Sequence, residues 1–129
     1  MKYVVFCFFT SILLSSCSKM GDTEKPKVTI TSPNQKDTIS GSVSEVSMQF
    51  NASDNISLSS LILEITDSNG SVLFADSKQI FGTSYAYKNS FVITKHPSKI
   101  KELTMVVHIS DESHNEEITS ATFYLAPSN

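Results

Sequence analysis

The sequence predicts an all-β protein, an antiparallel β-sandwich of about seven strands. Apolar and polar residues alternate with a period of two along successive segments, as they do in strands that bury one face. Turn residues recur at spacings of about ten residues, as in sandwiches built from short strands. No segment carries a convincing helical pattern, because the one amphipathic alternative, 57–65, is too rich in Ser and β-branched residues.

The expected strands follow one another along the chain from Pro26 onward. The Asn69-Gly70 pair predicts a tight hairpin between two of them, since it accepts the positive φ angles that such turns require. The aromatic and β-branched segment 81–93 is expected to break near Lys88-Asn89. The predicted strands cover 28–31, 46–52, 61–65, 72–75, 81–93, 103–109 and 121–125.

The N-terminal segment has the form of a processing signal. An apolar run begins after Lys2, is too short to span a bilayer, and ends in Leu14-Ser15-Ser16-Cys17. This ending resembles the lipobox of bacterial lipoproteins. The resemblance implies that residues 1–16 are a cleaved signal peptide. It also implies that Cys17 carries diacylglycerol and an amide-linked fatty acid such as palmitate, which anchor the chain in the cell envelope at the outer membrane.

Residues 17–25 comprise the lipidated cysteine and a short polar segment that reads as a flexible tether. Its lysines and carboxylates are similar to the surface-export signals of Bacteroidetes lipoproteins, which would place the domain on the cell surface. An ordinary polar spacer has the same composition, so a periplasmic location stays open.

Composition excludes several functions. Cleavage before Cys17 removes Cys7, and lipidation consumes Cys17, so no thiol is left for a disulfide, a thiolate nucleophile or a metal site. Loss of Lys2 leaves nine lysines, no arginine and thirteen carboxylates, a net charge of −4. Such a chain is a poor candidate for nucleic-acid binding.

Residues 26–127 form the expected β-sandwich domain. Three short motifs, one just before this domain and two within it, show a second resemblance. An acidic residue precedes Pro26 and an alternating strand, the second strand ends in Ala52-Ser53-Asp54-Asn55, and the penultimate strand ends in an aspartate before a turn. These features resemble bacterial immunoglobulin-like and cadherin-like domains. His114 occupies the position where glycine is usual in that turn. The antibody-type Cys–Trp–Cys core is absent.

In such a sandwich the first strand begins, and the second and sixth strands end, at one end of the molecule. Carboxylate and amide oxygens gathered there are the ligands that Ca²⁺ requires, and cadherin-like modules use this end in that way. The alternative is that these residues cap loops through local bonds to the backbone. The candidate Ca²⁺ ligands are Asp22, Glu24, Asp54, Asn55, Asp111 and Glu112.

Two further features suggest binding or modification. Tyr85, Tyr87 and Phe91 could form an exposed aromatic platform for a sugar or a peptide, although aromatic residues that alternate on a strand also serve as core. Thr38, within Asp37-Thr38-Ile39, resembles the acceptor of O-glycosylation in Bacteroidetes proteins.

The sequence does not predict an enzyme. His96 precedes Pro97 in a loop, His108 is expected on the solvent-facing side of its strand, and His114 lacks a second histidine at ligand spacing. Neither a nucleophile elbow nor a glycine-rich phosphate loop occurs. We expect a non-enzymatic binding, adhesion or assembly module that holds a glycan, a peptide or a partner lipoprotein near the membrane. A structural spacer or surface-coat component without a small ligand is the alternative.

Overall fold

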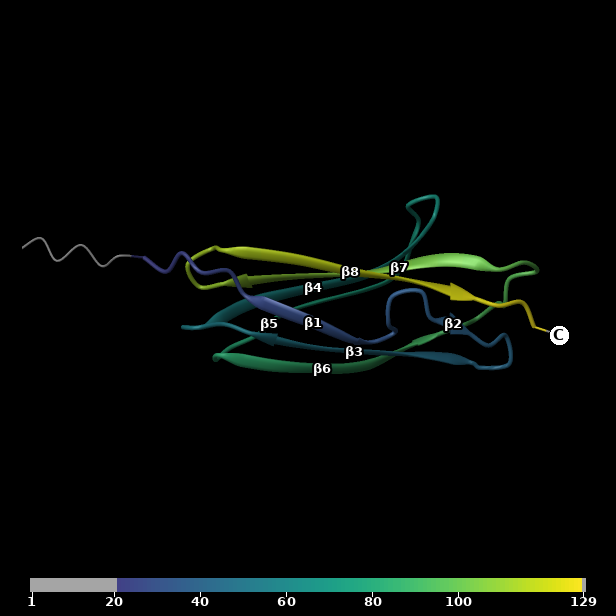
Figure 1. Ribbon diagram of the computed structural model, residues 1–129, viewed down its shortest axis with the longest axis horizontal. Coiled ribbons are helices and arrows are strands. Elements are labelled where there is room, and N and C mark those ends of the chain that lie inside the picture. The colour runs from purple at the N-terminus through teal and green to yellow at the C-terminus, as the bar shows by residue number, and fades with distance from the viewer. Residues whose placement is uncertain (1–20, 129) are drawn as a thin grey trace, which may run out of the picture.

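The computed structural model describes residues 21–128, which form two β-sheets packed face to face. Figure 1 shows an elongated molecule whose strands run along its long axis. The eight strands are β1 Lys27–Ser32, β2 Thr38–Ile39, β3 Glu45–Ser53, β4 Leu58–Asp67, β5 Val72–Gln79, β6 Ser84–Val92, β7 Lys101–Asp111 and β8 Glu116–Leu125.

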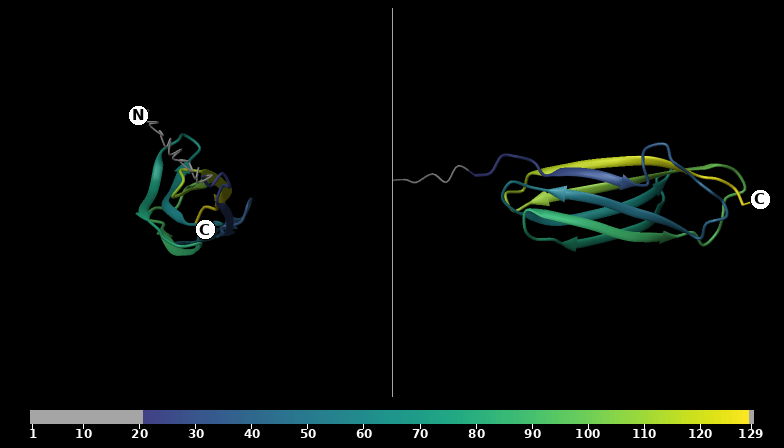
Figure 2. Two further views of the ribbon diagram at one scale, coloured as in Figure 1. Left: turned by 90° about the vertical axis from the view of Figure 1, so that its left-hand side faces the viewer. Right: turned by 60° about the horizontal axis from the view of Figure 1, so that its bottom comes forward.

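The two sheets differ in size. One has three antiparallel strands in the order β1-β3-β6, and the other has five in the order β2-β8-β7-β4-β5. All neighbours in the larger sheet are antiparallel except β2 and β8, which are parallel. The chain changes sheets at every connection except β4–β5 and β7–β8. The end-on view in Figure 2 shows the strands arranged around the long axis of the molecule. The predicted all-β sandwich is confirmed.

The core follows from the alternation seen in the sequence. In β7, Leu103, Met105, Val107 and Ile109 are all fully buried, while the residues between them face outward. β3 contributes Met48 and Phe50 from the opposite sheet. A slip of one residue in either strand would turn its apolar side chains to water, so the apolar pattern itself specifies the register.

Two details of the prediction were wrong. β6 continues through Lys88 and Asn89 without a break, because these residues pair with Gln49 and Met48 of β3 in an unbroken ladder. β2 was not expected at all. With two residues it is too short to show any periodicity, and its pairing with β8 is a tertiary contact that the local sequence does not encode.

The predicted Asn-Gly turn forms between β4 and β5. Gly70 has a φ of 79° and donates its backbone N–H to the carbonyl oxygen of Asp67. The Asp67 carboxylate accepts the N–H groups of Asn69 and Ser71 and lies 3.1 Å from Lys101 Nζ. The backbone bond from Ser71, together with the bond to Lys101, lowers the pKa of Asp67.

We call the end of the sandwich formed by loops 54–57, 80–83 and 112–115 the tethered end, because the N-terminal segment joins the domain there (Figure 1). Residue 128 lies at the opposite, distal end. Within residues 21–128, no helix is long and apolar enough to cross a membrane.

Candidate functional site

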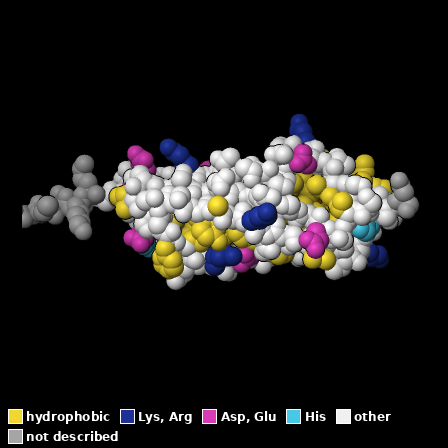
Figure 3. Space-filling view, turned by 90° about the horizontal axis from the view of Figure 1, so that it is seen from below, with side chains coloured by type: hydrophobic (Ala, Val, Ile, Leu, Met, Phe, Trp, Pro, Cys, Tyr) yellow, Lys and Arg dark blue, Asp and Glu magenta, His cyan; other side chains and the backbone are white. Residues whose placement is uncertain are grey.

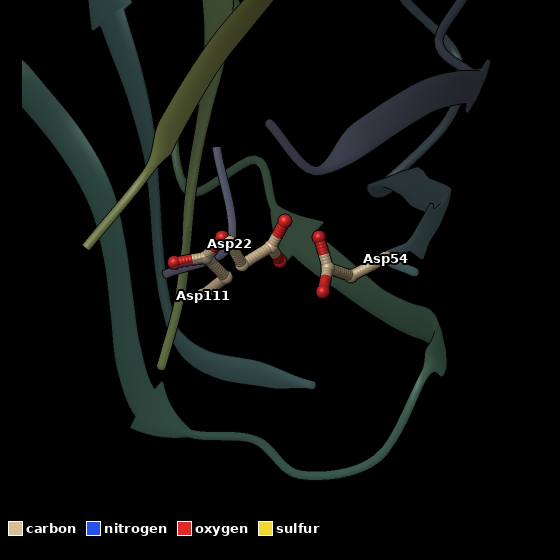
Figure 4. A group of neighbouring side chains, drawn as sticks. All are labelled: Asp22, Asp54 and Asp111. Carbon is tan, nitrogen blue, oxygen red and sulfur yellow. The ribbon is translucent and has the colours of Figure 1, made fainter. Parts of the chain in front are cut away.

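Three aspartates from distant parts of the sequence meet at the tethered end. Asp22 precedes β1, Asp54 follows β3, and Asp111 is the last residue of β7. One carboxylate oxygen from each lies within 4.8 Å of the other two, and Figure 4 shows the three side chains pointing toward one another. We call these three residues the acidic group.

Asp111 is the most firmly held of the three. Its side chain is almost fully buried, and it accepts two hydrogen bonds from Asn115: the backbone N–H at 2.8 Å and the Nδ2 amide at 2.6 Å. The Ser59 hydroxyl donates to the backbone carbonyl of Asp111 at 2.7 Å. The two bonds from Asn115 hold the carboxylate, and the Ser59 bond holds the backbone at the end of β7.

Asp54 and Asp22 each use one carboxylate oxygen as a hydrogen-bond acceptor, and within residues 21–128 the other oxygen has no donor. Asp54 Oδ2 accepts the backbone N–H groups of Ile56 and Ser57, both at 2.9 Å. Asp22 Oδ1 accepts the Glu24 N–H and the Asn55 amide, both at 3.0 Å. Asp54 Oδ1 and Asp22 Oδ2 are buried and have no hydrogen-bond partner among residues 21–128.

Two unpartnered buried carboxylate oxygens beside a third carboxylate are unfavourable for the isolated protein. Buried polar atoms normally find a partner, and three like charges at this separation repel one another. A hard cation removes both costs, because carboxylate oxygens are its preferred ligands and water completes its shell of six to eight oxygens. The arrangement therefore suits a divalent cation such as Ca²⁺.

The six predicted ligands behave differently in the structure. Asp22, Asp54 and Asp111 come together, whereas Glu24 and Glu112 are exposed and stand outside the acidic group. Asn55 contacts Asp22, but through its amide nitrogen, which is a donor. The sequence analysis did not select Asn115, which connects Asp22 to Asp111. Its place four residues after Asp111, in a tight turn, was the one available signal.

The segment before β1 is less free than the sequence suggested. Residues 17–25 were expected to be a free tether, but the backbone oxygen of Asp22 accepts the Asn115 amide at 3.0 Å and its side chain is bonded to Asn55. The chain from Asp22 onward is therefore held against the domain.

The predicted aromatic platform is wrong. Tyr87 is only 4% exposed and stacks on Phe50 with ring centroids 4.9 Å apart. Phe91 packs edge-on against Phe74, and Tyr85 is half-buried against the core. These residues point inward because alternation on β6 places all three on the face that the second sheet covers.

Tyr87 instead belongs to a polar cluster that spans the gap between the edge strands β5 and β6. Its hydroxyl donates to Asp76 Oδ2 at 2.9 Å, and Lys78 Nζ lies 2.9 Å from the same oxygen and 5.1 Å from the Tyr87 ring centre. The hydrogen bond with Lys78 lowers the pKa of Asp76, and burial raises the pKa of Tyr87.

The predicted glycosylation and lipid-attachment sites, and two of the histidines, do not belong to the acidic group. Thr38 lies exposed in β2, and the Cys17 lipid-attachment site lies outside the described residues. His114 is exposed with a φ of 69°, so this histidine adopts the left-handed conformation that glycine enters most readily. His108 Nε2, on the outer face of the larger sheet, lies 3.4 Å from Glu116 Oε2.

The two-sheet architecture defines the protein as an immunoglobulin-like β-sandwich. No protein-family model matches the sequence, and no curated protein matches it. Among solved structures, the chain is similar to the periplasmic chaperone SfaE, with a TM-score of 0.59 and 10% identity over 80% of this chain and 58% of the chaperone chain. It also aligns with CopC from Methylosinus trichosporium OB3b, with a TM-score of 0.48 and 13% identity over 80% of this chain and 97% of that chain.

Proposed function

We propose that this protein is a lipid-anchored module of the bacterial cell envelope whose immunoglobulin-like domain binds Ca²⁺ at the acidic group. Its role is non-enzymatic: the domain holds a binding partner, either a glycan, a peptide or another lipoprotein, close to the membrane. Lipid attachment at Cys17 rests on the lipobox resemblance. A protein partner in the envelope is also compatible with the fold's likeness to a periplasmic chaperone.

The observation that carries the calcium proposal is the pair of unpartnered buried oxygens, Asp22 Oδ2 and Asp54 Oδ1, facing the Asp111 carboxylate. Loop caps do not require this arrangement. Capping explains Asp54 Oδ2, which accepts two loop N–H groups, but it leaves Asp54 Oδ1 without a role. The acidic group also joins segments before β1, after β3 and at the end of β7, so a bound cation would cross-link both sheets to the N-terminal segment.

Calcium titration followed by thermal melting of the fragment from Ser18 onward tests this proposal. A ligand that binds only the folded state stabilises it by RT ln(1 + [L]/Kd). With a Kd of about 10⁻⁴ to 10⁻³ M, as in extracellular calcium modules, about 10 mM calcium adds roughly 1.4 to 2.7 kcal/mol. For a domain of this size that raises the melting midpoint by several degrees.

An Asp54→Asn variant distinguishes the two possible roles of Asp54, which are to bind a cation and to cap the loop. Its side-chain carbonyl can still accept the Ile56 and Ser57 N–H groups, so the loop keeps its cap. We expect the variant to lose most of the calcium response. In EDTA it should melt at or above the temperature of the unmodified domain, because one of three repelling charges is gone. Glu102→Gln, at the distal end, is the matched control and should respond to calcium normally. An unchanged midpoint at millimolar calcium would overturn the site.

A further inference from the structure

The tethered end carries two large apolar side chains that the core does not cover. Phe81 is 71% exposed and Ile56 is 58% exposed. Other large apolar side chains are exposed elsewhere on the described part of the chain, namely Ile62, Val72, Leu73, Val92, Ile100 and Ile118. Their loops are neighbours: the Asp54 N–H donates to Thr83 O and the Leu58 N–H to Gly82 O, both at 2.9 Å. Figure 3 shows hydrophobic side chains at the end of the molecule from which the N-terminal chain leaves. Single exposed apolar side chains are ordinary on a protein surface, so these two call for a contact only if an apolar surface lies within their reach.

The length of chain between the lipid and the domain indicates what that contact is. Asp22 is bonded to Asn55 and Asn115 at the tethered end. Only five residue steps separate Asp22 from Cys17, and a fully extended chain of that length spans at most about 18 Å. With a lipid on Cys17, the tethered end therefore cannot move further than that from the membrane surface. This step rests on the lipid attachment proposed above.

We propose that Ile56 and Phe81 insert into the interfacial layer of the membrane that holds the anchor, so that the sandwich stands on the bilayer by its tethered end. Aromatic and aliphatic side chains gain free energy in this layer, and a lipid anchor that is already present removes most of the entropic cost of bringing them there. Lys25 and Lys27, both exposed beside Asp54, are positioned to meet lipid phosphates. The distal end then projects away from the membrane and is free to meet a partner.

A single fluorescent reporter tests this orientation, because the chain contains no tryptophan. Phe81→Trp places the only indole at the tethered end. Ile100→Trp places it at the distal end, where Ile100 is 66% exposed between β6 and β7. Both positions are open to solvent, so either substitution should leave the fold intact, which the thermal midpoint checks. Each full-length lipidated variant is reconstituted into phosphatidylcholine vesicles, with or without bromine on the acyl chains.

Membrane insertion predicts a blue-shifted emission for F81W and a loss of its intensity in brominated vesicles, with neither change for I100W. Equal, solvent-like emission from both variants would overturn the proposal. So would a blue shift of F81W without bromine quenching, because that result would mean that a second copy or another protein covers Phe81. Vesicles of phosphatidylcholine carry no net charge, and the measurement is made in EDTA, so that calcium at the acidic group does not affect the comparison.

Flotation and the mass of the Cys17 peptide distinguish failure of this inference from failure of the anchor. A chain that floats with the vesicles and carries the lipid mass, yet shows no quenching of F81W, retains the proposed anchor and overturns only the insertion. A chain without the lipid mass that stays out of the vesicle fraction overturns both.

Discussion

The amide nitrogen of Asn115 donates to the backbone oxygen of Asp22 at 3.0 Å and to Asp111 Oδ2 at 2.6 Å. One side chain thus joins the segment before the first strand to the end of β7, across 93 residues of sequence. This link places two of the three carboxylates of the acidic group relative to each other.

Replacing Asn115 with alanine should destabilise the domain. The Asp111 carboxylate is almost fully buried, and the substitution removes its 2.6 Å amide donor. Leaving a buried acceptor with too few donors costs roughly 1–3 kcal/mol. Urea unfolding measures the change. Asn34→Ala is the control, since its amide bonds to Asp37 only at an exposed site, and we expect an effect within about 0.5 kcal/mol. Equal losses from the two variants would mean that Asn115 does not have this linking role.

Gly41→Ala should also be destabilising, for a steric reason. Gly41 is buried, and a methyl group there would overlap the backbone carbonyl of Pro127. Since backbone atoms must move to make room, we expect a loss of about 1–3 kcal/mol or more in the free energy of unfolding. The matched control is Gly21→Ala, because the space around Gly21 is open. If Gly41→Ala is as stable as its control, the backbone at Pro127 moves aside without cost and the steric argument is wrong.

The polar cluster between β5 and β6 predicts a pH dependence of stability. The hydrogen bond with Lys78 lowers the pKa of Asp76 below its ordinary value of 3.8. The stability that Asp76 contributes is therefore present above pH 3.8 and is lost as the pH falls through the lower pKa of the folded state. Asp76→Asn should be less stable than the unmodified domain near pH 7, and the difference should shrink toward pH 2. Thermal melting across this range measures the effect, and a difference that is independent of pH would contradict the assignment.

Tyr87→Phe isolates the hydroxyl in the same cluster. The ring keeps its stacking on Phe50, while the hydroxyl's hydrogen bond to Asp76 and the one it accepts from the Asn89 amide are both lost. A typical net contribution of such a bond is about 0.5–1.5 kcal/mol, so a loss of that order is expected in urea unfolding. Tyr124→Phe is the control, because its outward-facing hydroxyl makes no side-chain hydrogen bond within residues 21–128. If Tyr87→Phe loses no more free energy of unfolding than Tyr124→Phe, the Tyr87 hydroxyl does not stabilise the contact between β5 and β6.

Much of the fold could be predicted from local pattern. Strict alternation in 46–52 and 103–109 identified β3 and β7, and the Asn69-Gly70 pair located the hairpin. These signals are strong because side chains in a strand point alternately to its two faces, whatever partner the strand later finds. β2 could not be predicted because a strand of two residues is too short to show an alternation of apolar and polar side chains.

The acidic group shows where prediction from sequence ends. Motifs at the ends of three strands indicated that Asp22, Asp54 and Asp111 share one end of the sandwich. The sequence could not show that Glu24 and Glu112 stay outside the group, or that Asn115 connects its members. Likewise, alternation in β6 showed that Tyr85, Tyr87 and Phe91 share a face but not which face is buried.

The sequence by itself determined the fold class, the positions of the longer strands and the resemblance of the N-terminal segment to a lipoprotein signal, because these depend on residues close together in the chain. Tertiary structure decided which carboxylates meet, which aromatic face is buried and which apolar side chains remain uncovered at the tethered end. Those outcomes depend on the packing of one sheet against the other and on contacts between residues far apart in sequence, such as Asp22 and Asn115, which no local pattern encodes.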